Sequence, residues 1–249
     1  MIEQLDEKIV AQLPPEIIEH IELLERMRKD FVANVSHELR TPLTVVLGYL
    51  ELLLTKPDND KVLSNDLIEK MYQQSLRMQN IIEDLLLLSH IETNKPIPIS
   101  ENHVNIKHLL NIIQQSAEPL RLEKQQQLSF AIDEKLTIKG NQDELHSLFS
   151  NLIFNAIKYT PCQGKIKVRW FRQENKAIFE VQDTGIGIAA KHIPRLTERF
   201  YRIDKSRSRA SGGTGLGLAI AKHILIRHQG QLEIESEEGI GSIFRCIFS

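Results

Sequence analysis

The sequence predicts an α+β protein: a helical hairpin followed by a sandwich of one sheet with helices on a single face. Two observations predict it. Apolar residues recur at helical spacing up to residue 88, and after residue 98 short β-rich runs alternate with helical ones. Pro96 and Pro98 separate these two regions, so we expect a domain boundary near residues 95–102.

The first helix is expected over residues 17–54, in which Pro42 is the only strong breaker. Residues 56–60 (KPDND) predict a turn before the second helix. The two apolar stripes, at steps of three and four, consist of Val32, Val35, Leu39, Val46, Leu50 and Leu53, then Met71, Met78, Ile82, Leu85 and Leu88. A lone hairpin cannot cover its own apolar face, so we expect a homodimer with a dimeric four-helix bundle. Packing of both helices on the rest of the chain is the alternative.

In the second region, strands are expected over residues 127–132, 166–171, 177–181, 232–236 and 242–248. Helices are expected over residues 106–120, 142–159 and 216–229. Asn141 with Glu144 has the pattern of a capping box at the start of the second of these helices.

Composition excludes several classes of protein. The 249 residues carry a formal net charge of -2, which gives no basic field for nucleic acid. Cys162 and Cys246 lack metal-ligand spacing and are expected to be reduced thiols. No apolar run is long enough to cross a bilayer, and no signal-peptide pattern is present. The chain as given is therefore expected to be soluble and intracellular, or to be the inner portion of a membrane protein cut before residue 1.

The run SHELRTP, residues 36–42, carries the first chemical motif. His37 and Thr41 lie one turn apart, away from the apolar stripe, so His37 is expected to face solvent. Glu38 could accept a proton from one ring nitrogen and make the other a better nucleophile. Pro42 removes a helix hydrogen bond and predicts a bend beside His37. A surface histidine without chemistry is the alternative.

Three further motifs have the residue types of a nucleotide site. Residues 151–160 (NLIFNAIKYT) put two amides, an ammonium and a phenol on one helix face, for Mg²⁺, phosphate and a base. Residues 183–188 (DTGIGI) follow a strand and offer a carboxylate for an adenine amine. Residues 212–218 (GGTGLGL) open a helix whose free N–H groups suit phosphates. A solvated polar helix face and ordinary turns are the alternatives.

A basic stretch lies between the two glycine motifs. Its position favours a lid over ATP phosphates, against a solvated charge run or a nucleic-acid patch. Its basic residues are Lys191, Arg195, Arg199, Arg202, Lys205, Arg207 and Arg209.

Taken in order, these motifs resemble the H, N, G1 and G2 boxes of bacterial sensor histidine kinases, and the run around Phe200 resembles their F box. The similarity extends from about Lys29 to the end. Residues 31–44 and 193–202 look most like the phosphate-regulon sensor kinases, which implies a role in phosphate-starvation signalling.

The resemblance implies a signalling helix or linker (1–28), a dimerisation and histidine phosphotransfer domain (29–95) and a Bergerat-type catalytic ATP-binding domain (100–249). It implies that ATP phosphorylates His37 with Glu38 as base, and that a response-regulator aspartate then accepts the phosphoryl group. Thr41 would hold a phosphatase water, and Asn155 would hold Mg²⁺. The implied ATP-binding residues are Asn151, Asn155, Lys158, Tyr159, Asp183, Gly185, Gly187, Phe200, Arg202, Gly213, Thr214, Gly215, Leu216 and Gly217.

Two other functions fit the same motifs. The first is a Bergerat-type ATPase. Such ATPases place a water-activating glutamate where this chain has Asn151, and because an amide cannot act as a general base, Asn151 argues against efficient hydrolysis. A non-catalytic dimeric scaffold is the second alternative, against which the intact Asn155, Asp183 and loop glycines argue.

Overall fold

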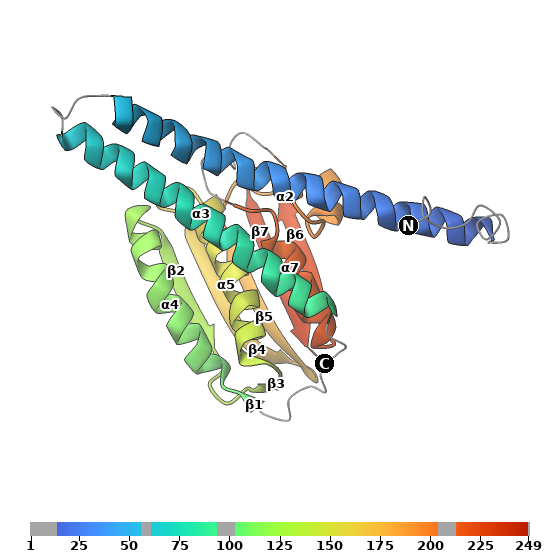
Figure 1. Cartoon of the computed structure of the whole chain (residues 1–249). Coiled ribbons are helices and arrows are strands. Elements are labelled where there is room, and N and C mark those ends of the chain that lie inside the picture. The colour runs from blue at the N-terminus through green and yellow to red at the C-terminus, as the bar shows by residue number, and fades with distance from the viewer. Residues whose placement is uncertain (1–13, 56–60, 94–102, 204–212, 249) are drawn as a thin grey trace. The chain divides into compact units, whose positions relative to one another are not determined.

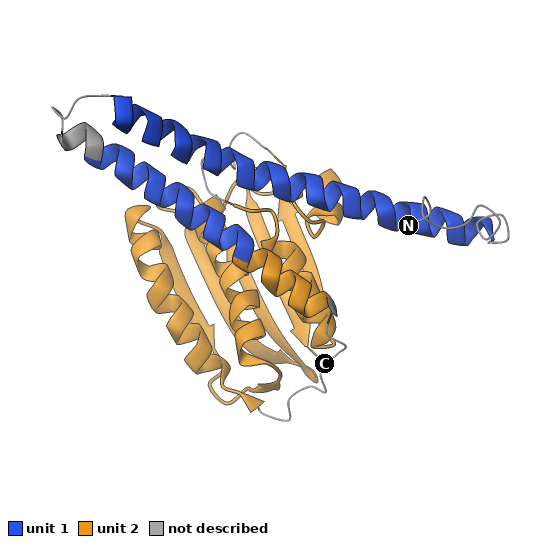
Figure 2. Ribbon diagram, in the orientation of Figure 1, with its two compact units in different colours: residues 1–82 blue, residues 83–249 orange. Residues whose placement is uncertain are grey.

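Two long helices, α2 (Pro15–Thr55) and α3 (Lys61–Thr93), begin the fold (Figure 1). The computed structural model describes residues 14–55, 61–93, 103–203 and 213–248. The chain divides into two compact units, residues 1–82 and 83–249, so the end of α3 belongs to the second unit (Figure 2). The expected turn at 56–60 and the expected boundary at 95–102 lie outside the described residues.

The apolar stripes of the hairpin are only partly covered in the single chain. Val35, Leu39 and Val46 are half-buried, whereas Val32 and Leu50 are 58% and 41% exposed. In α3, Met71, Met78, Leu85 and Leu88 are half-buried or buried as expected, but Ile82 is 47% exposed and Ile81 is fully buried in its place. α2 continues through Pro42 as one helix, and Pro42 itself is buried.

A five-stranded sheet forms the second unit, in the order β2-β4-β5-β7-β6. The strands are β2 (Gln127–Ile132), β4 (Lys165–Gln173), β5 (Lys176–Asp183), β6 (Gln231–Glu237) and β7 (Gly241–Phe248). β2 pairs with β4 in parallel, and the other neighbours are antiparallel. Two short strands that were not expected, β1 (His103–Val104) and β3 (Ile138–Lys139), pair separately.

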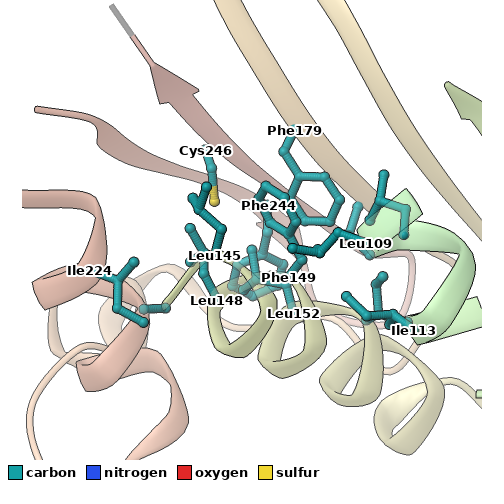
Figure 3. Close-up of a cluster of buried hydrophobic side chains, with 14 of the residues drawn as sticks. Leu109, Ile113, Leu145, Leu148, Phe149, Leu152, Phe179, Ile224, Phe244 and Cys246 are labelled. Atoms are coloured by element: carbon teal, nitrogen blue, oxygen red, sulfur yellow. The ribbon is translucent and has the colours of Figure 1, made fainter. Parts of the chain in front are cut away.

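Helices α4 (Ile106–Glu123), α5 (Gln142–Tyr159) and α7 (Gly217–Arg227) cover one face of this sheet, as expected (Figure 1). A short 3-10 helix, η2 (Ala190–Arg195), follows β5. Phe149 of α5 is fully buried and stacks on Phe179 of β5 with ring centroids 4.1 Å apart (Figure 3). Burial of such aromatic rings contributes strongly to stability and fixes α5 against the sheet.

At the start of α5, only one of the two hydrogen bonds of the expected capping box forms. The Asn141 side chain accepts from Asp143 N and Glu144 N, as an N-cap does. Glu144, however, pairs with Arg227 at 3.0 Å, and the Asn141 N–H donates to His228 Nε2 instead. The reciprocal bond from Glu144 was therefore predicted wrongly. The cause is burial: the Glu144 side chain is only 7% exposed, so its charge needs a cationic partner.

Candidate functional site

His37 is exposed on α2, as the helical spacing predicted. Thr41 lies one turn later, and its hydroxyl donates to the His37 carbonyl at 3.1 Å. This bond uses the hydroxyl proton, so Thr41 offers lone pairs to a water. The ring of His37 is thus accessible to a phosphoryl donor arriving from solvent.

Glu38 is half-buried and binds across the hairpin, where Arg77 Nη2 of α3 donates to Glu38 Oε2 at 3.1 Å. Nothing in the local pattern around residue 38 indicated this partner, because the two residues are 39 positions apart.

The nucleotide motifs converge in the second unit, as close approaches at the glycines reveal. A methyl group on Gly213 would lie 2.2 Å from Lys158 Nζ, and one on Gly217 would lie 2.4 Å from Asn151 Oδ1. One on Gly185 would lie 2.8 Å from the Tyr159 carbonyl oxygen. The second glycine loop therefore lies against the helix face that carries Asn151 and Lys158, and the first lies against the C-terminal end of the same helix.

Asp183 ends β5 and is 8% exposed. Burial raises the pKa of its carboxyl, and the backbone N–H groups of Gly185 and Ser242, which donate to it, act in the opposite direction. The Gly185 N–H lies 2.7 Å from Asp183 Oδ1. A buried carboxylate held in this way is suited to accept from one further donor, such as an exocyclic amine.

The loop Gly185–Gly187 is joined to the end of α5 and to β6. Ile186 N donates to the Tyr159 carbonyl at 3.3 Å. Gly187 is near Glu237, because a methyl group there would lie 1.8 Å from the Glu237 carbonyl oxygen. Tyr159 is 40% exposed, and partial burial raises the pKa of its phenol while nearby Arg202 lowers it.

Phe200 packs directly on the second glycine loop. Its N–H donates to the Gly215 carbonyl at 2.9 Å, and a methyl group on Gly215 would lie 2.9 Å from Phe200 Cα. Gly215 has φ +75°, which glycine adopts without strain. Leu216 is buried beside it, and α7 begins at Gly217 with its first N–H groups next to the loop.

Thr214 makes two hydrogen bonds within the second unit. Its hydroxyl accepts from Leu216 N at 3.1 Å and donates to Asp84 Oδ2 at 2.8 Å. Burial raises the pKa of Asp84, and the bond from Thr214 opposes this shift. Asp84 was not identified from the sequence, because it lies in an ordinary polar position of α3.

Two arginines of the basic stretch, Arg195 and Arg199, have partners within the second unit. Arg195 forms an ion pair with Glu198 at 3.0 Å and lies 4.3 Å from the centre of the Tyr201 ring. Arg199 pairs with Glu92. These contacts give Arg195 and Arg199 local structural partners, which charge counting did not predict. Lys205, Arg207 and Arg209 lie outside the described residues, as does Gly212.

Lys124 and Gln126 cap the C-terminus of α5 and were also missed. Lys124 Nζ donates to the carbonyls of Ile157 and Lys158 at 2.9 and 2.8 Å. Gln126 Nε2 donates to Ile157 and Thr160 carbonyls at 2.9 and 2.6 Å. A cation at a helix C-terminus satisfies otherwise unpaired carbonyls, so this cap holds the turn that carries Lys158 and Tyr159.

The described residues contain no group of three or more His, Cys, Asp or Glu side chains that could hold a metal ion. Asn155 is half-buried on α5, one turn from Asn151 and from Tyr159. An amide oxygen can ligate Mg²⁺ only together with other oxygens, and nucleotide phosphates supply them in kinases.

Within the described part of the chain, no helix is both long and apolar enough to span a membrane.

Two family models match the chain. Residues 27–94 match the His Kinase A (phospho-acceptor) domain. Residues 140–249 match the family described as Histidine kinase-, DNA gyrase B-, and HSP90-like ATPase. With His37 in the first match and the nucleotide motifs in the second, the chain combines the two domains of the histidine kinases.

Within that class the chain is similar to phosphate-regulon sensors. It is 50% identical to the Phosphate regulon sensor protein PhoR of Pseudomonas aeruginosa, over 93% of this chain and 52% of that protein. It is 41% identical to PhoR of Haemophilus influenzae, over 96% of this chain and 55% of that protein. The chain thus spans about half the length of these curated relatives.

Solved structures share the fold. The Acinetobacter baumannii histidine kinase AdeS has a TM-score of 0.69 at 23% identity, covering 86% of this chain and 97% of that one. Histidine kinase ThkA, solved in complex with the response regulator TrrA, has a TM-score of 0.69 at 20% identity, covering 94% and 67%. These likenesses support the architecture of hairpin and sandwich.

Proposed function

We propose that this chain binds ATP in its second unit, phosphorylates His37 and passes the phosphoryl group to an aspartate of a response regulator. The observation that carries the proposal is that the second glycine loop lies against Asn151 and Lys158 of α5 and the first against the end of α5, with an exposed His37 on a separate helix. Phosphoryl transfer needs in-line placement and charge stabilisation more than covalent help. This site offers both through its ammonium and loop N–H groups.

Each residue has a role in this proposal. Asp183 accepts from the adenine amine, Tyr159 lines the base, and Lys158 with the loop N–H groups contacts the phosphates. Asn155 would hold Mg²⁺, which would supply positive charge to offset that of the phosphates. Glu38 takes the imidazole proton, and Thr41 orients the water that later removes phosphate from the partner.

We further propose a homodimer, with domains at residues 29–95 and 100–249 after a signalling helix or linker at 1–28. Leu43, Leu47 and Leu50 are 47%, 51% and 41% exposed at helical spacing on α2. A second copy of the hairpin would cover this apolar row. The segment between these two domains lies outside the described residues.

The similarity to PhoR sensors supports a role in phosphate-starvation signalling. Since the chain spans 52% and 55% of those relatives, we propose that it is the cytoplasmic kinase portion of a longer sensor. The remaining part would hold the sensor in the bacterial inner membrane.

The test is incubation of the purified chain with γ-labelled ATP and Mg²⁺, followed by addition of a response regulator. We expect label on the chain that is stable to base and lost in acid, as a phosphohistidine is, and that moves to the regulator. Steady release of free phosphate without labelled chain would favour the ATPase alternative. Absence of both signals and of ATP binding would favour the scaffold.

Asn151 discriminates the kinase from the ATPase. Its Oδ1 lies beside Gly217 at the start of α7. We expect Asn151→Glu not to increase labelling of the chain, because a carboxylate there adds negative charge near the phosphates and activates water rather than imidazole. Label on the chain and free phosphate are measured in the same reaction. A clear gain in labelling would contradict the kinase mechanism.

A further inference from the structure

The Arg77–Glu38 ion pair joins the two helices of the first unit beside the phosphoacceptor. The N–O distance is 3.1 Å, and the side chains of Arg77 and Glu38 are 12% and 23% exposed. By contrast, the Lys70–Asp66 pair lies within one helix, and its side chains are 51% and 55% exposed. The first pair is therefore shielded from water, whereas the second is an ordinary surface pair.

Because the Arg77–Glu38 pair is shielded from water, each side chain depends on the other for charge compensation and orientation. A carboxylate with little access to water needs a compensating charge, and loss of one partner leaves the other poorly solvated. A guanidinium also restricts the orientation of the carboxylate, because its donors lie in a rigid plane. Glu38 follows His37 directly on α2, so what holds Glu38 also determines where its carboxylate lies relative to the imidazole.

The chemistry at His37 gives this contact a function. One ring nitrogen uses its lone pair to bond to the γ-phosphorus, and the bond to the bridging oxygen breaks with its electron pair leaving on ADP. The proton on the other ring nitrogen then passes to Glu38, which leaves the imidazole ring uncharged and the phosphoryl group anionic. The incoming phosphate is anionic, so an uncompensated carboxylate beside it would repel it.

We infer that Arg77 is a positioning residue for phosphorylation of His37, acting through Glu38: it orients the carboxylate and offsets its negative charge as the γ-phosphate arrives. The inference rests on the proposed kinase function. Arg77 has no assigned role in nucleotide binding, since Asp183 and the glycine loops lie in the other unit. Its removal should therefore change kcat for autophosphorylation and leave KM for ATP unchanged.

The experiment is a double-mutant cycle on the full chain, with Glu38→Gln, Arg77→Gln and the double variant, followed by initial rates of His37 labelling. We expect Arg77→Gln to lower kcat by roughly tenfold to a hundredfold, part of the contribution of a positioned base. In the Glu38→Gln background the same change should alter kcat less than about twofold, because a residue acting through another loses its effect when that residue is gone. Arg77→Lys should recover part of the rate, since it keeps the charge without the planar fork.

Lys70→Gln is the matched control: it also removes a cationic partner from α3 but should leave kcat unchanged. Equal losses from Arg77→Gln in both backgrounds, or a wild-type rate for Arg77→Gln, would overturn the inference. A wild-type chain that never forms phosphohistidine would instead overturn the proposed function, so the two failures are distinguishable. Circular dichroism and ATP affinity of each variant separate a lost helix pair from a lost catalytic effect.

Discussion

Replacing His37 with glutamine is expected to abolish labelling of the chain by γ-labelled ATP while leaving ATP affinity unchanged. In this proposal the imidazole of His37 is the group that receives the phosphoryl group from ATP, so its loss leaves the transfer without an acceptor. The nucleotide motifs lie in the second unit and do not depend on residue 37. Since His37 is exposed, the substitution should change the free energy of unfolding by no more than about 0.5 kcal/mol.

His20 offers a matched control, because it is also an exposed histidine of α2. His20→Gln should label at the wild-type rate. Labelling that persists in the His37→Gln chain, with the same acid lability, would assign the phosphoacceptor to another histidine. Mixing His37→Gln chains with Asp183→Asn chains extends the test: restored label would indicate that one subunit phosphorylates the other.

Asp183→Asn is expected to weaken ATP binding by about 1.5–3 kcal/mol, the range for a hydrogen bond to a charged group, or roughly tenfold to a hundredfold in Kd. Asp183 is nearly buried and accepts from the Gly185 N–H. An asparagine would replace one acceptor oxygen with an NH₂ group. Because an NH₂ group can only donate, it cannot accept from the backbone N–H groups or from the adenine amine. The main defect of the variant should be a raised Kd for ATP rather than a slower phosphoryl transfer to His37.

The pH dependence of ATP affinity provides a second readout of Asp183. Burial raises the pKa of this carboxyl in the free protein. An adenine amine donates more strongly to the ionised form and so lowers the same pKa when ATP is bound. Affinity should therefore fall as the pH decreases through the raised pKa, and binding should release protons in that window.

Isothermal titration calorimetry in buffers of different ionisation enthalpy measures both the affinity for ATP and the number of protons released on binding. The Asp183→Asn chain should lose this proton release, apart from what the nucleotide phosphates contribute. Asp143→Asn is the control, since Asp143 is an exposed carboxylate in the first turn of α5. A wild-type Kd for the Asp183→Asn chain would contradict the assignment of Asp183 to the adenine amine.

Several elements were predictable from local sequence because neighbours in the chain determine them. α5 begins and ends as expected, since Asn141 caps its start and Thr160-Pro161 stops its end. β2 likewise has the expected limits, from its alternation of half-buried and exposed residues. The two-residue strands β1 and β3 were missed because so short a segment has no periodicity to read.

The sequence by itself also determined the set of nucleotide motifs, since glycines, amides and a carboxylate at these spacings have few other uses in combination. Only the tertiary structure decided their partners: Arg77 for Glu38, Lys124 and Gln126 for the end of α5, and Asp84 for Thr214. It also decided the order of the strands, with β2 added in parallel to β4. The physical reason is separation along the chain. Caps and periodicity arise between residues a few positions apart, whereas the Asp84–Thr214 contact joins residues 130 positions apart and forms only when the core has packed.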